Sequence, residues 1–429
     1  MTPDSTDAAR RSIDAIWRLE AAKVIGRAAR IVHDIGLAED LAHDALISAL
    51  ETWPADGIPS NPGAWLMTAV SRRALDHLRH RQMAATKAEE ISREIDFAHA
   101  VACDDAGQAL DARIDDDIGD DLLRLIFTAC HPVLAPEARC ALTLRLIGGL
   151  STDEIARAYL KSEATIAQRI VRAKRSLAAA GVPYEVPRGA DLQQRLASVL
   201  EVIYLIFNEG YAATAGDNWM RPALCEEALR LGRVLAGLLP DESEVFGLLA
   251  LMEIQASRFA ARLSADGDPV LLLDQDRNRW DRLLIRRGLD ALARAEALPG
   301  RQHHLGPYAL QAGIAACHAR ATTADATDWP RIVALYDVLG QISPSPVVSL
   351  NRAVAVSMAY GPAAALDLVD ELLDEPSLQQ YHLLSSVRGE LLKRLNRLAE
   401  ARSEFERAAC LTKNIREQGL LLIKAASCF

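Results

Sequence analysis

The sequence predicts an all-α protein. Half of its 429 residues are hydrophobic, with Ala and Leu dominant, and aromatic residues make up only 5%. Segments in which Val, Ile and Thr alternate with polar residues, as in strands, are scarce. A chain of this length favours two to four domains. We therefore expect several helical domains and no extensive sheet.

The first clear element is a helix over residues 38–51, AEDLAHDALISALE. Its apolar residues recur at spacings of three and four and form one face. The other face carries Glu39, Asp40, His43, Asp44 and Glu51, with Ile47 exposed among them. Asp40 and Asp44 lie one turn apart, where like charges repel by about 0.2–0.5 kcal/mol. The helix dipole alone accounts for carboxylates in a first turn. The residues by themselves therefore do not identify what this acidic face binds.

The next element is a basic helix within residues 61–82, NPGAWLMTAVSRRALDHLRHRQ. Its apolar stripe begins at Trp65, and its polar side carries Arg72, Arg73, Arg79, His80 and Arg81. An aromatic residue at the head of a basic helix suits single-stranded DNA, because bases stack on rings while cations hold the backbone. Taken alone, Trp65 is better explained as a core tryptophan.

An acidic stretch follows at residues 86–120. It holds eleven acidic residues against Lys87, Arg93 and Arg113, and it runs into the segment DDDIGDD at residues 115–121. This composition predicts a linker with partial helix.

Residues 121–181 carry the most specific pattern. Ser151 and Glu154 form an S-x-x-E capping box that begins a short helix over residues 152–159. Ser162 caps a second helix over residues 163–179. A short helix, a tight break and a longer helix are the layout of a helix-turn-helix.

The second of these helices separates an apolar stripe from a polar face. The stripe holds Ile166, Ile170, Ala173 and Leu177, and outside it lie Gln168, Arg169, Arg172, Lys174 and Arg175. Gln and Arg pair with base edges, and Arg and Lys neutralise phosphates. An ordinary solvated basic face is the alternative, but the two caps and the tight break favour DNA.

The segment VPYEVPRGA at residues 182–190 breaks helix twice with proline and predicts a domain boundary. Beyond it, residues 191–429 form the largest block. With Gly389 at the eighth position of a 34-residue repeat, Ala401, Phe405 and Ala408 fall where tetratricopeptide repeats (TPRs) place them. A looser unit precedes it, so TPR-like repeats are predicted near residues 346–412, with the preceding helices capping the stack.

Composition excludes several classes of protein. The net charge of −10 argues against a general nucleic-acid binder, although it hides a basic site. The first residues lack the layout of a signal peptide, and no apolar run approaches the ~18 residues of a membrane span. Seven cysteines without a CxxC pair fit reduced thiols, and Cys130 with His131 is one weak metal-binding pair. We expect a cytoplasmic protein without membrane contact, cofactor or metal.

The order of these elements resembles the group IV (extracytoplasmic function, ECF) sigma factors of bacterial RNA polymerase. AEDLAHDALISALETW is similar to the D-A-E-D-L helix of region 2, and Trp65, Leu66, Asp76 and Arg79 match the region 2 helix that follows. In region 4 the matching residues are Leu150, Glu154, Ile155, Ala156, Thr165, Arg169, Arg172, Ala173 and Leu177. The long tail resembles the subgroup with a large TPR-like extension, of which LIFNEGYAAT and LLLDQDRNRWDR look like signatures.

The resemblance implies a division of the chain and a role for each part. Region 2 (residues 10–85) would bind the coiled coil of the polymerase β′ subunit through Glu39, Asp40, His43, Asp44 and Ile47. It would hold the locally melted minus-ten element through Trp65, Arg72, Arg73, Arg79 and Arg81. Residues 86–120 would link it to region 4 (residues 121–181). Region 4 would sit on the β flap and read double-stranded DNA at the minus-thirty-five element through Thr165, Gln168, Arg169, Arg172, Lys174 and Arg175.

The resemblance also implies that the chain directs promoter-specific transcription initiation and is not an enzyme. Two departures weaken the transfer of base-level contacts: Arg72 stands where the family usually has Asn, and Ala164 where it has Gly. The extension would regulate sigma activity, binding a regulatory protein or ligand, or would act as a scaffold.

Other functions stay open from the residues alone. A polymerase-independent regulator would join the helix-turn-helix to a sensing domain. A helical, magnesium-dependent isoprenoid synthase would use the carboxylates of AEDLAHD and DDDIGDD, although it would leave the basic helix unexplained. In the tail, Asp274 and Asp276 fit an acid/base pair, or salt bridges to Arg277, Arg279 and Arg282.

Overall fold

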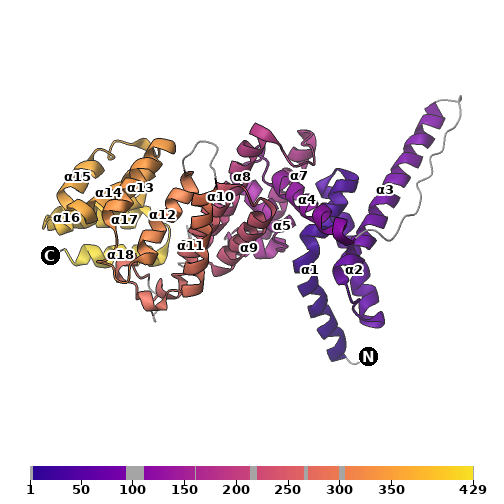
Figure 1. Ribbon diagram of the computed structural model, residues 1–429, viewed down its shortest axis with the longest axis horizontal. Helices are drawn as coiled ribbons and strands as arrows, with labels where there is room; N and C mark the ends of the chain where they lie inside the picture. Colours follow the sequence, from indigo (N-terminus) through magenta and orange to yellow (C-terminus); the bar gives the residue numbers. More distant parts are fainter. Residues whose placement is uncertain are drawn as a thin grey trace. The chain divides into compact units, whose positions relative to one another are not determined.

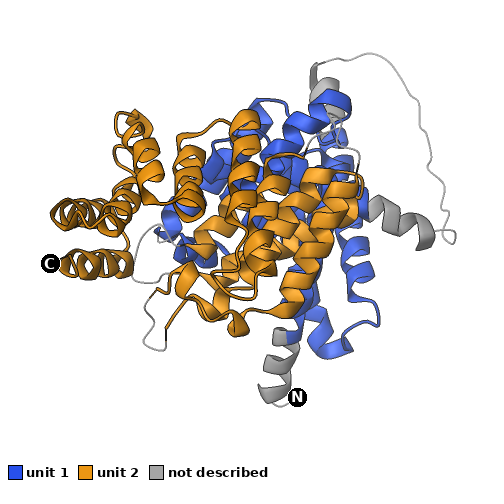
Figure 2. Cartoon of the chain, turned by 60° about the vertical axis from the view of Figure 1, so that its left-hand side comes forward, with its two compact units in different colours: residues 1–202 blue, residues 203–429 orange. Residues whose placement is uncertain are grey.

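The computed structural model confirms the helical fold class. It describes the backbone of residues 3–92, 111–159, 161–212, 220–264, 269–298 and 305–428, and their side chains except in 3–11, 84–92 and 111–118. Within these ranges the chain forms α-helices and four short 3₁₀ helices, and the only β pairing is one bridge between Leu263 and Pro269. The chain divides into two compact units, Met1–Val202 and Ile203–Phe429, coloured separately in Figure 2.

Three helices form the first part of unit 1 (Figure 1). They are α1 (Pro3–Val32), α2 (Ile35–Asp56) and α3 (Pro62–Ser92). Each of them packs against the other two. Asp34 caps α2 by accepting a hydrogen bond from the Leu37 amide, and Asn61 accepts one from the Ala64 amide at the start of α3. Small residues at spacings of three and four on α2, among them Ala38, Ala42 and Ala45, are fully buried and let the helices approach closely.

Four helices form the second part of unit 1. They are α4 (Asp111–Ala129), α5 (Pro136–Leu146), α6 (Thr152–Ala158) and α7 (Glu163–Ala179). The capping box is complete: the Ser151 hydroxyl accepts from the Glu154 amide, and the Glu154 carboxylate accepts from the Ser151 amide. Ser162 caps α7 at the Thr165 amide. The bounds of α7 are those that the sequence predicts, and α6 ends one residue earlier than predicted.

The structure describes part of the predicted linker and the whole of the predicted boundary segment. Helix α3 extends to Ser92 and α4 begins at Asp111, so both ends of the predicted linker are helical. Residues 93–110 of that linker lie outside the described residues. The prolines at residues 182–190 do not end unit 1, because its boundary falls inside α8 (Gly189–Tyr211).

Side chains of α8 explain why its first half belongs to unit 1. The Arg195 guanidinium donates to the Phe127 carbonyl at 3.1 Å, and the Ser198 hydroxyl donates to the Cys130 carbonyl at 2.6 Å. Both carbonyls lie at the end of α4, where a helix leaves its last carbonyls unsatisfied. A chain ending at residue 190 would therefore lack part of the core of unit 1.

Unit 2 begins with a tightly packed helical group. Its members are α9 (Pro222–Leu238), α10 (Ser243–Ala256), α11 (Arg282–Ala297) and α12 (Pro307–Arg320), with the 3₁₀ helices η1 (Phe259–Ala261), η2 (Leu272–Asp274) and η3 (Arg277–Arg279) between α10 and α11. Helix α10 is the centre, since it packs against α9, α11 and α12. Gly247 and Gly288 permit this, because a Cβ at either would come within 3.0 Å of a neighbouring helix.

The rest of unit 2 is a succession of helices in which each packs against the next in sequence (Figure 1). They are α13 (Trp329–Ile342), α14 (Pro346–Tyr360), α15 (Pro362–Asp370), α16 (His382–Arg394), α17 (Leu398–Leu411) and α18 (Ile415–Ala426), with η4 (Pro376–Leu378) after α15. Gly389 of α16 faces the ring of Phe405 on α17, and a Cβ there would lie 2.9 Å from the ring. This contact joins two residues to which the sequence analysis assigns repeat positions.

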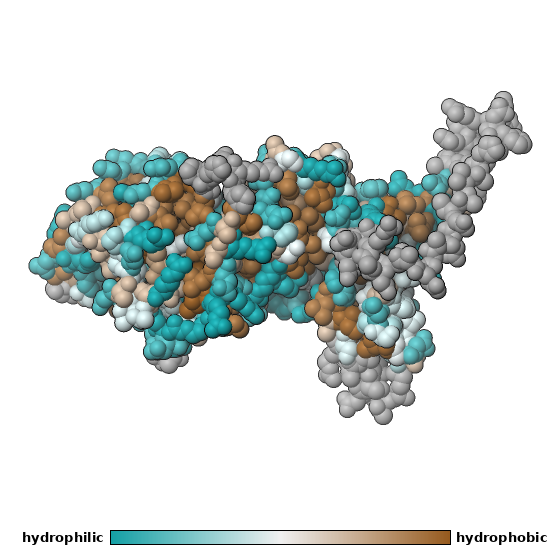
Figure 3. All heavy atoms as spheres, viewed as in Figure 1, coloured by the Kyte–Doolittle hydropathy of each residue, from teal (hydrophilic) through white to brown (hydrophobic). Residues whose placement is uncertain are grey.

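In the view of Figure 3, hydrophobic and hydrophilic residues alternate in bands over the helices of unit 2. Among the described residues, no helix combines the length and hydrophobicity needed to cross a bilayer.

Candidate nucleic-acid interface

The outward face of α2 presents two carboxylates and one apolar side chain. Asp40 and Asp44 are exposed, and Ile47 keeps 52% of its surface exposed. Glu51 extends the same face by one turn. This is the surface that the sequence assigned to the polymerase, and these residues are accessible for such a contact.

Glu39 corrects the sequence-based view of this face, which placed it among the exposed residues. It is only 5% exposed. Its carboxylate accepts a hydrogen bond from the Arg145 side chain of α5 at 2.7 Å and another from the Lys174 ammonium of α7. Burial raises the pKa of Glu39, but Lys174 and Arg145 outweigh burial and hold that pKa below its ordinary value.

His43 is also less open than predicted. Its ring is half-buried, lies 5.8 Å from the Trp17 ring, and has its Nε2 atom 3.2 Å from the Arg145 guanidinium. One arginine of α5 thus contacts both Glu39 and His43. Nothing in the sequence around Arg145 distinguishes it from an ordinary surface arginine, so sequence reasoning missed this residue.

A hollow of about 610 Å³ lies where α2, the loop before α3 and the first turns of α3 meet. Its lining includes Trp65, Arg72 and Arg73 from the predicted minus-ten set. It also includes polar side chains that the sequence analysis missed, namely Ser48, Ser60, Asn61 and Thr68. The hollow therefore combines one aromatic ring, two cations and several hydrogen-bonding groups, which is what an unstacked base and its phosphates require.

Trp65 has both of the roles that the sequence left open. Its ring is half-buried and packs edge-on against Trp53 at 5.3 Å between centroids, so it contributes to the core. Its remaining surface lines the hollow. The Arg73 guanidinium is positioned by a 2.6 Å hydrogen bond to the Ser48 hydroxyl, whereas Arg72 is exposed.

The other two predicted minus-ten residues lie further along α3. Arg79 is exposed and forms an ion pair with Asp76 at 3.3 Å, one turn earlier on the same helix. Arg81 is exposed as well. Neither lines the hollow, so on this geometry they suit the phosphate backbone better than a flipped base.

The recognition helix α7 presents the side chains that the sequence predicts. Thr165, Gln168, Arg172 and Arg175 are exposed, and Arg169 is half-buried. The apolar stripe is buried as predicted, with Ile166 at 0% and Ile170 at 6% exposure. Lys174 is the exception, because it lies half-buried and bonds to Glu39.

Four of these residues line one concave surface. A hollow of about 360 Å³ runs between α7 and the turn before α5, and Thr165, Gln168, Arg169 and Arg172 line one of its sides. Two arginines and a glutamine on the same side of a capped helix form a surface suited to base edges and phosphates.

Family models match the two halves of unit 1 separately. A model for sigma-70 region 2 matches residues 16–83, and a model for sigma-70 region 4 matches residues 124–177. The probable ECF RNA polymerase sigma factor SigI of Mycobacterium tuberculosis is 28% identical over 165 residues, which cover 38% of this chain and 54% of that protein. This chain belongs to the ECF sigma factors. The ECF sigma factor SigK of Mycobacterium ulcerans is also similar, at 28% over 160 residues, covering 36% of this chain and 78% of SigK.

The remaining part of this ECF sigma factor is its large C-terminal extension. Residues 195–296 match a family of unknown function, DUF6596. An uncharacterized protein of Rhizobium meliloti is 43% identical over 396 residues, covering 92% of this chain and 90% of that protein. Its similarity thus includes the extension as well as the sigma regions.

The two unexplained signatures of the extension contribute to its packing. Asp276 and Asp281 each accept hydrogen bonds from backbone amides at the start of a helix. Arg277 donates to the carbonyls of His318 and Ala321, which cap the end of α12. The predicted salt bridges are therefore wrong for Arg277, because its guanidinium donates to these two carbonyls and to the Thr327 hydroxyl rather than to Asp274 or Asp276. Tyr211 of the other signature accepts a hydrogen bond from Arg258 at 2.6 Å.

Cys130 and His131, the predicted weak metal-binding pair, both make other contacts. The Cys130 thiol is buried and bonds to Thr143, and burial raises its pKa to about 12, so it stays protonated. His131 Nδ1 accepts from the Val133 amide. In the part of the chain that the structure describes, no three His, Cys, Asp or Glu side chains come together as a metal site.

Proposed function

We propose that this ECF sigma factor binds core RNA polymerase and directs promoter-specific initiation of transcription. The observation that carries the proposal is the joint presence, in unit 1, of the hollow beside Trp65 and the capped recognition helix α7. The hollow suits an unstacked base, and α7 suits the major groove of a duplex. A promoter that is melted at one element and double-stranded at the other offers both an unstacked base and a major groove.

The proposed partners of each surface follow from its chemistry. The exposed carboxylates of α2, with Ile47 between them, form an apolar contact inside a charged rim, which fits a basic coiled coil such as that of the polymerase β′ subunit. Region 4 binds the β flap and the minus-thirty-five element. Core polymerase then supplies most of the binding energy, since a chain with a net charge of −10 has little general affinity for DNA.

Run-off transcription with purified core polymerase tests the proposal. We expect promoter-specific transcripts from core plus this protein and none from core alone. Arg172→Ala should reduce the transcript, whereas the exposed Arg407→Ala on α17 should leave it unchanged and serves as the matched control. Equal transcription with and without the protein would refute the proposal. Tight binding of the protein alone to a palindromic operator would instead identify a stand-alone regulator.

We further propose that the C-terminal extension sets the activity of the sigma regions. Its succession of packed helices offers grooves for a peptide, a helix or a ligand. The test is a chain ended after Val202, because the first half of α8 contributes Arg195 and Ser198 to unit 1. Increased transcription would identify an inhibitory extension, and lost transcription by a folded chain would identify a required one. Unchanged transcription would count against both roles.

A further inference from the structure

Both signature segments of the extension contribute to one cluster of buried arginines in unit 2. Arg258, Arg262 and Arg277 are each more than nine-tenths buried. Arg277 and Trp280 belong to the segment at residues 271–282, and Tyr211 belongs to the segment at residues 205–214. We call these five residues the arginine cluster. The packing role described above explains part of it, but not why three cations are buried together.

Two aromatic rings connect the three guanidiniums. Arg262 Cζ lies 3.5 Å from the centroid of the Tyr211 ring, and Arg258 Cζ lies 5.7 Å from the same centroid. Arg258 Cζ also lies 6.0 Å from the centroid of the Trp280 ring, and Arg277 Cζ lies 4.9 Å from it. Ring faces attract cations at these distances. They carry no charge, however, so the repulsion between the guanidiniums remains.

The hydrogen bonds of Arg258 and Arg277 do not neutralise them either. Arg258 donates to the Tyr211 hydroxyl at 2.6 Å. Arg277 donates to two backbone carbonyls at the end of α12 and, at 3.3 Å, to the Thr327 hydroxyl. Among the residues that the structure describes, every partner of these two guanidiniums is a neutral group.

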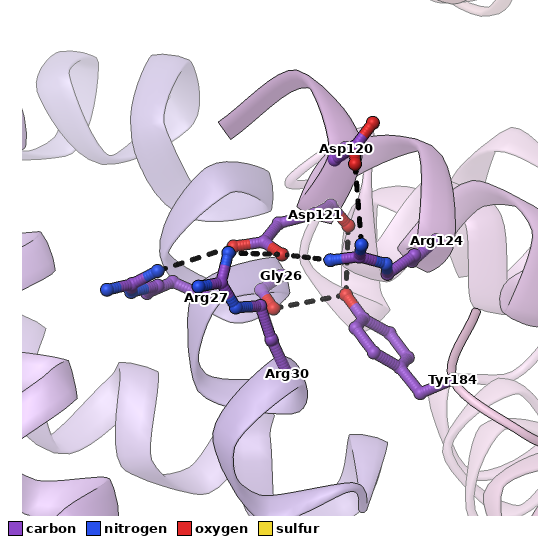
Figure 4. A network of polar contacts seen from close by, with 7 residues as sticks. All are labelled: Gly26, Arg27, Arg30, Asp120, Asp121, Arg124 and Tyr184. Carbon is purple, nitrogen blue, oxygen red and sulfur yellow. Dashed lines mark hydrogen bonds and ion pairs between the residues drawn. The ribbon is translucent and has the colours of Figure 1, made fainter. Parts of the chain in front are cut away.

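The buried carboxylate of Asp121 in unit 1 shows the usual alternative (Figure 4). It is 1% exposed, accepts a hydrogen bond from Arg124 at 2.9 Å, and lies 3.6 Å from Arg30 and 3.9 Å from Arg27. Burying a charge without an opposite charge is strongly unfavourable, which is why buried ions are normally paired. The arginine cluster therefore has the charge of a site whose counter-ion is a separate molecule.

Buried nitrogens at the cluster also lack hydrogen-bond acceptors. Within the described residues, Arg258 Nε and Trp280 Nε1 are buried donors without a partner, and so is the Nδ1 atom of the neighbouring His318. Native structures leave few buried donors unsatisfied. Burial, together with the charges of Arg258 and Arg277, lowers the pKa of His318 to about 4, so the positive field extends to this ring.

We propose that the arginine cluster is a binding site for a small oxyanion with two negative charges, in the chemical class shared by phosphate groups and dicarboxylates. A guanidinium presents paired N–H donors that match the oxygens of either group. Such a ligand supplies both the missing negative charge and acceptors for Arg258 Nε and Trp280 Nε1. Solvent reaches the edge of the cluster, because Tyr211 is only half-buried and the adjacent Ala212 is exposed. The site goes beyond the proposed function, since it gives the extension a ligand class of its own.

Isothermal titration calorimetry of the full-length protein in phosphate-free buffer tests the site. The probes are inorganic phosphate and malonate, with sodium chloride at equal ionic strength as the reference. Arg258→Gln removes one guanidinium, and Trp280→Phe removes the unpartnered Nε1 while keeping an aromatic ring. Arg294→Gln is the matched control, because Arg294 also stacks on a ring, 4.6 Å from the Phe246 centroid, but lies outside the cluster.

We expect wild type and Arg294→Gln to bind one molecule of phosphate or malonate per chain, and the tighter probe identifies which of the two groups the site prefers. Arg258→Gln should weaken binding about tenfold or more, since it removes a charged hydrogen-bond donor. Trp280→Phe should weaken it as well. Failure of both probes to bind wild type, or wild-type affinity in the folded variants, would overturn the site. If one variant does not fold, the other decides. The titration contains no polymerase or DNA, so its result is independent of whether the chain directs transcription.

Discussion

Replacing Ile47 by alanine tests the polymerase contact of α2 at its apolar centre. Ile47 is 52% exposed in the free chain, so about half of its surface remains to be buried in a complex. Full burial of an isoleucine is worth about 1.5–3 kcal/mol, so the substitution should cost about 0.8–1.5 kcal/mol of binding. That corresponds to an increase of about four- to twelvefold in the Kd for core polymerase.

Fluorescence anisotropy of the labelled protein, titrated with core polymerase at fixed salt, measures this change. Ile423→Ala on α18 is the matched control, because that isoleucine is 69% exposed and lies in the extension. Both variants remove surface side chains, so the free energy of unfolding should change by less than about 0.5 kcal/mol. A wild-type Kd for a well-folded Ile47→Ala protein, or an equal loss in Ile423→Ala, would refute the assignment of this face.

Three further predictions follow from the same surfaces. Asp40→Arg combined with Asp44→Arg should abolish core binding through like-charge repulsion. The melting temperature should stay unchanged, since both residues are exposed. Wild-type binding by the folded double variant would show that α2 is not part of the interface. Arg172→Ala should lower binding of the polymerase complex to its own minus-thirty-five sequence by about 1–3 kcal/mol. Band-shift titrations against a scrambled element measure that loss, and an equal loss on both DNAs would assign Arg172 to phosphate contact instead. At pH 8 iodoacetamide should modify the exposed Cys410 and spare Cys130, whose pKa of about 12 keeps it a thiol until strongly alkaline pH; mass spectrometry showing fast modification of Cys130 in the folded protein would contradict its burial.

Local signals predicted the helix-turn-helix closely. The caps at Ser151 and Ser162 act on amides three residues away, so the residues that start each helix also lie beside it in the sequence. The apolar stripe of α7 is equally local, and the structure buries all four of its members. For the same reason the prediction that Gln168 and Arg172 are exposed is correct. The polar rim of the hollow beside Trp65 was missed because it combines residues from α2, a loop and α3.

The sequence by itself therefore determined the helical class and the outward side chains of α7, because helix periodicity and capping depend on neighbours within about four residues. The order of the sigma regions came from the resemblance of its motifs to those of a known family. The tertiary structure alone decided which charges are buried. Periodicity assigns a carboxylate to the outer face of its own helix, but a second helix can cover that face. Arg145 and Lys174, more than one hundred residues away, cover Glu39, and Arg27 and Arg30 enclose Asp121. Those pairings depend on how the packed helices meet in space, which no local pattern records.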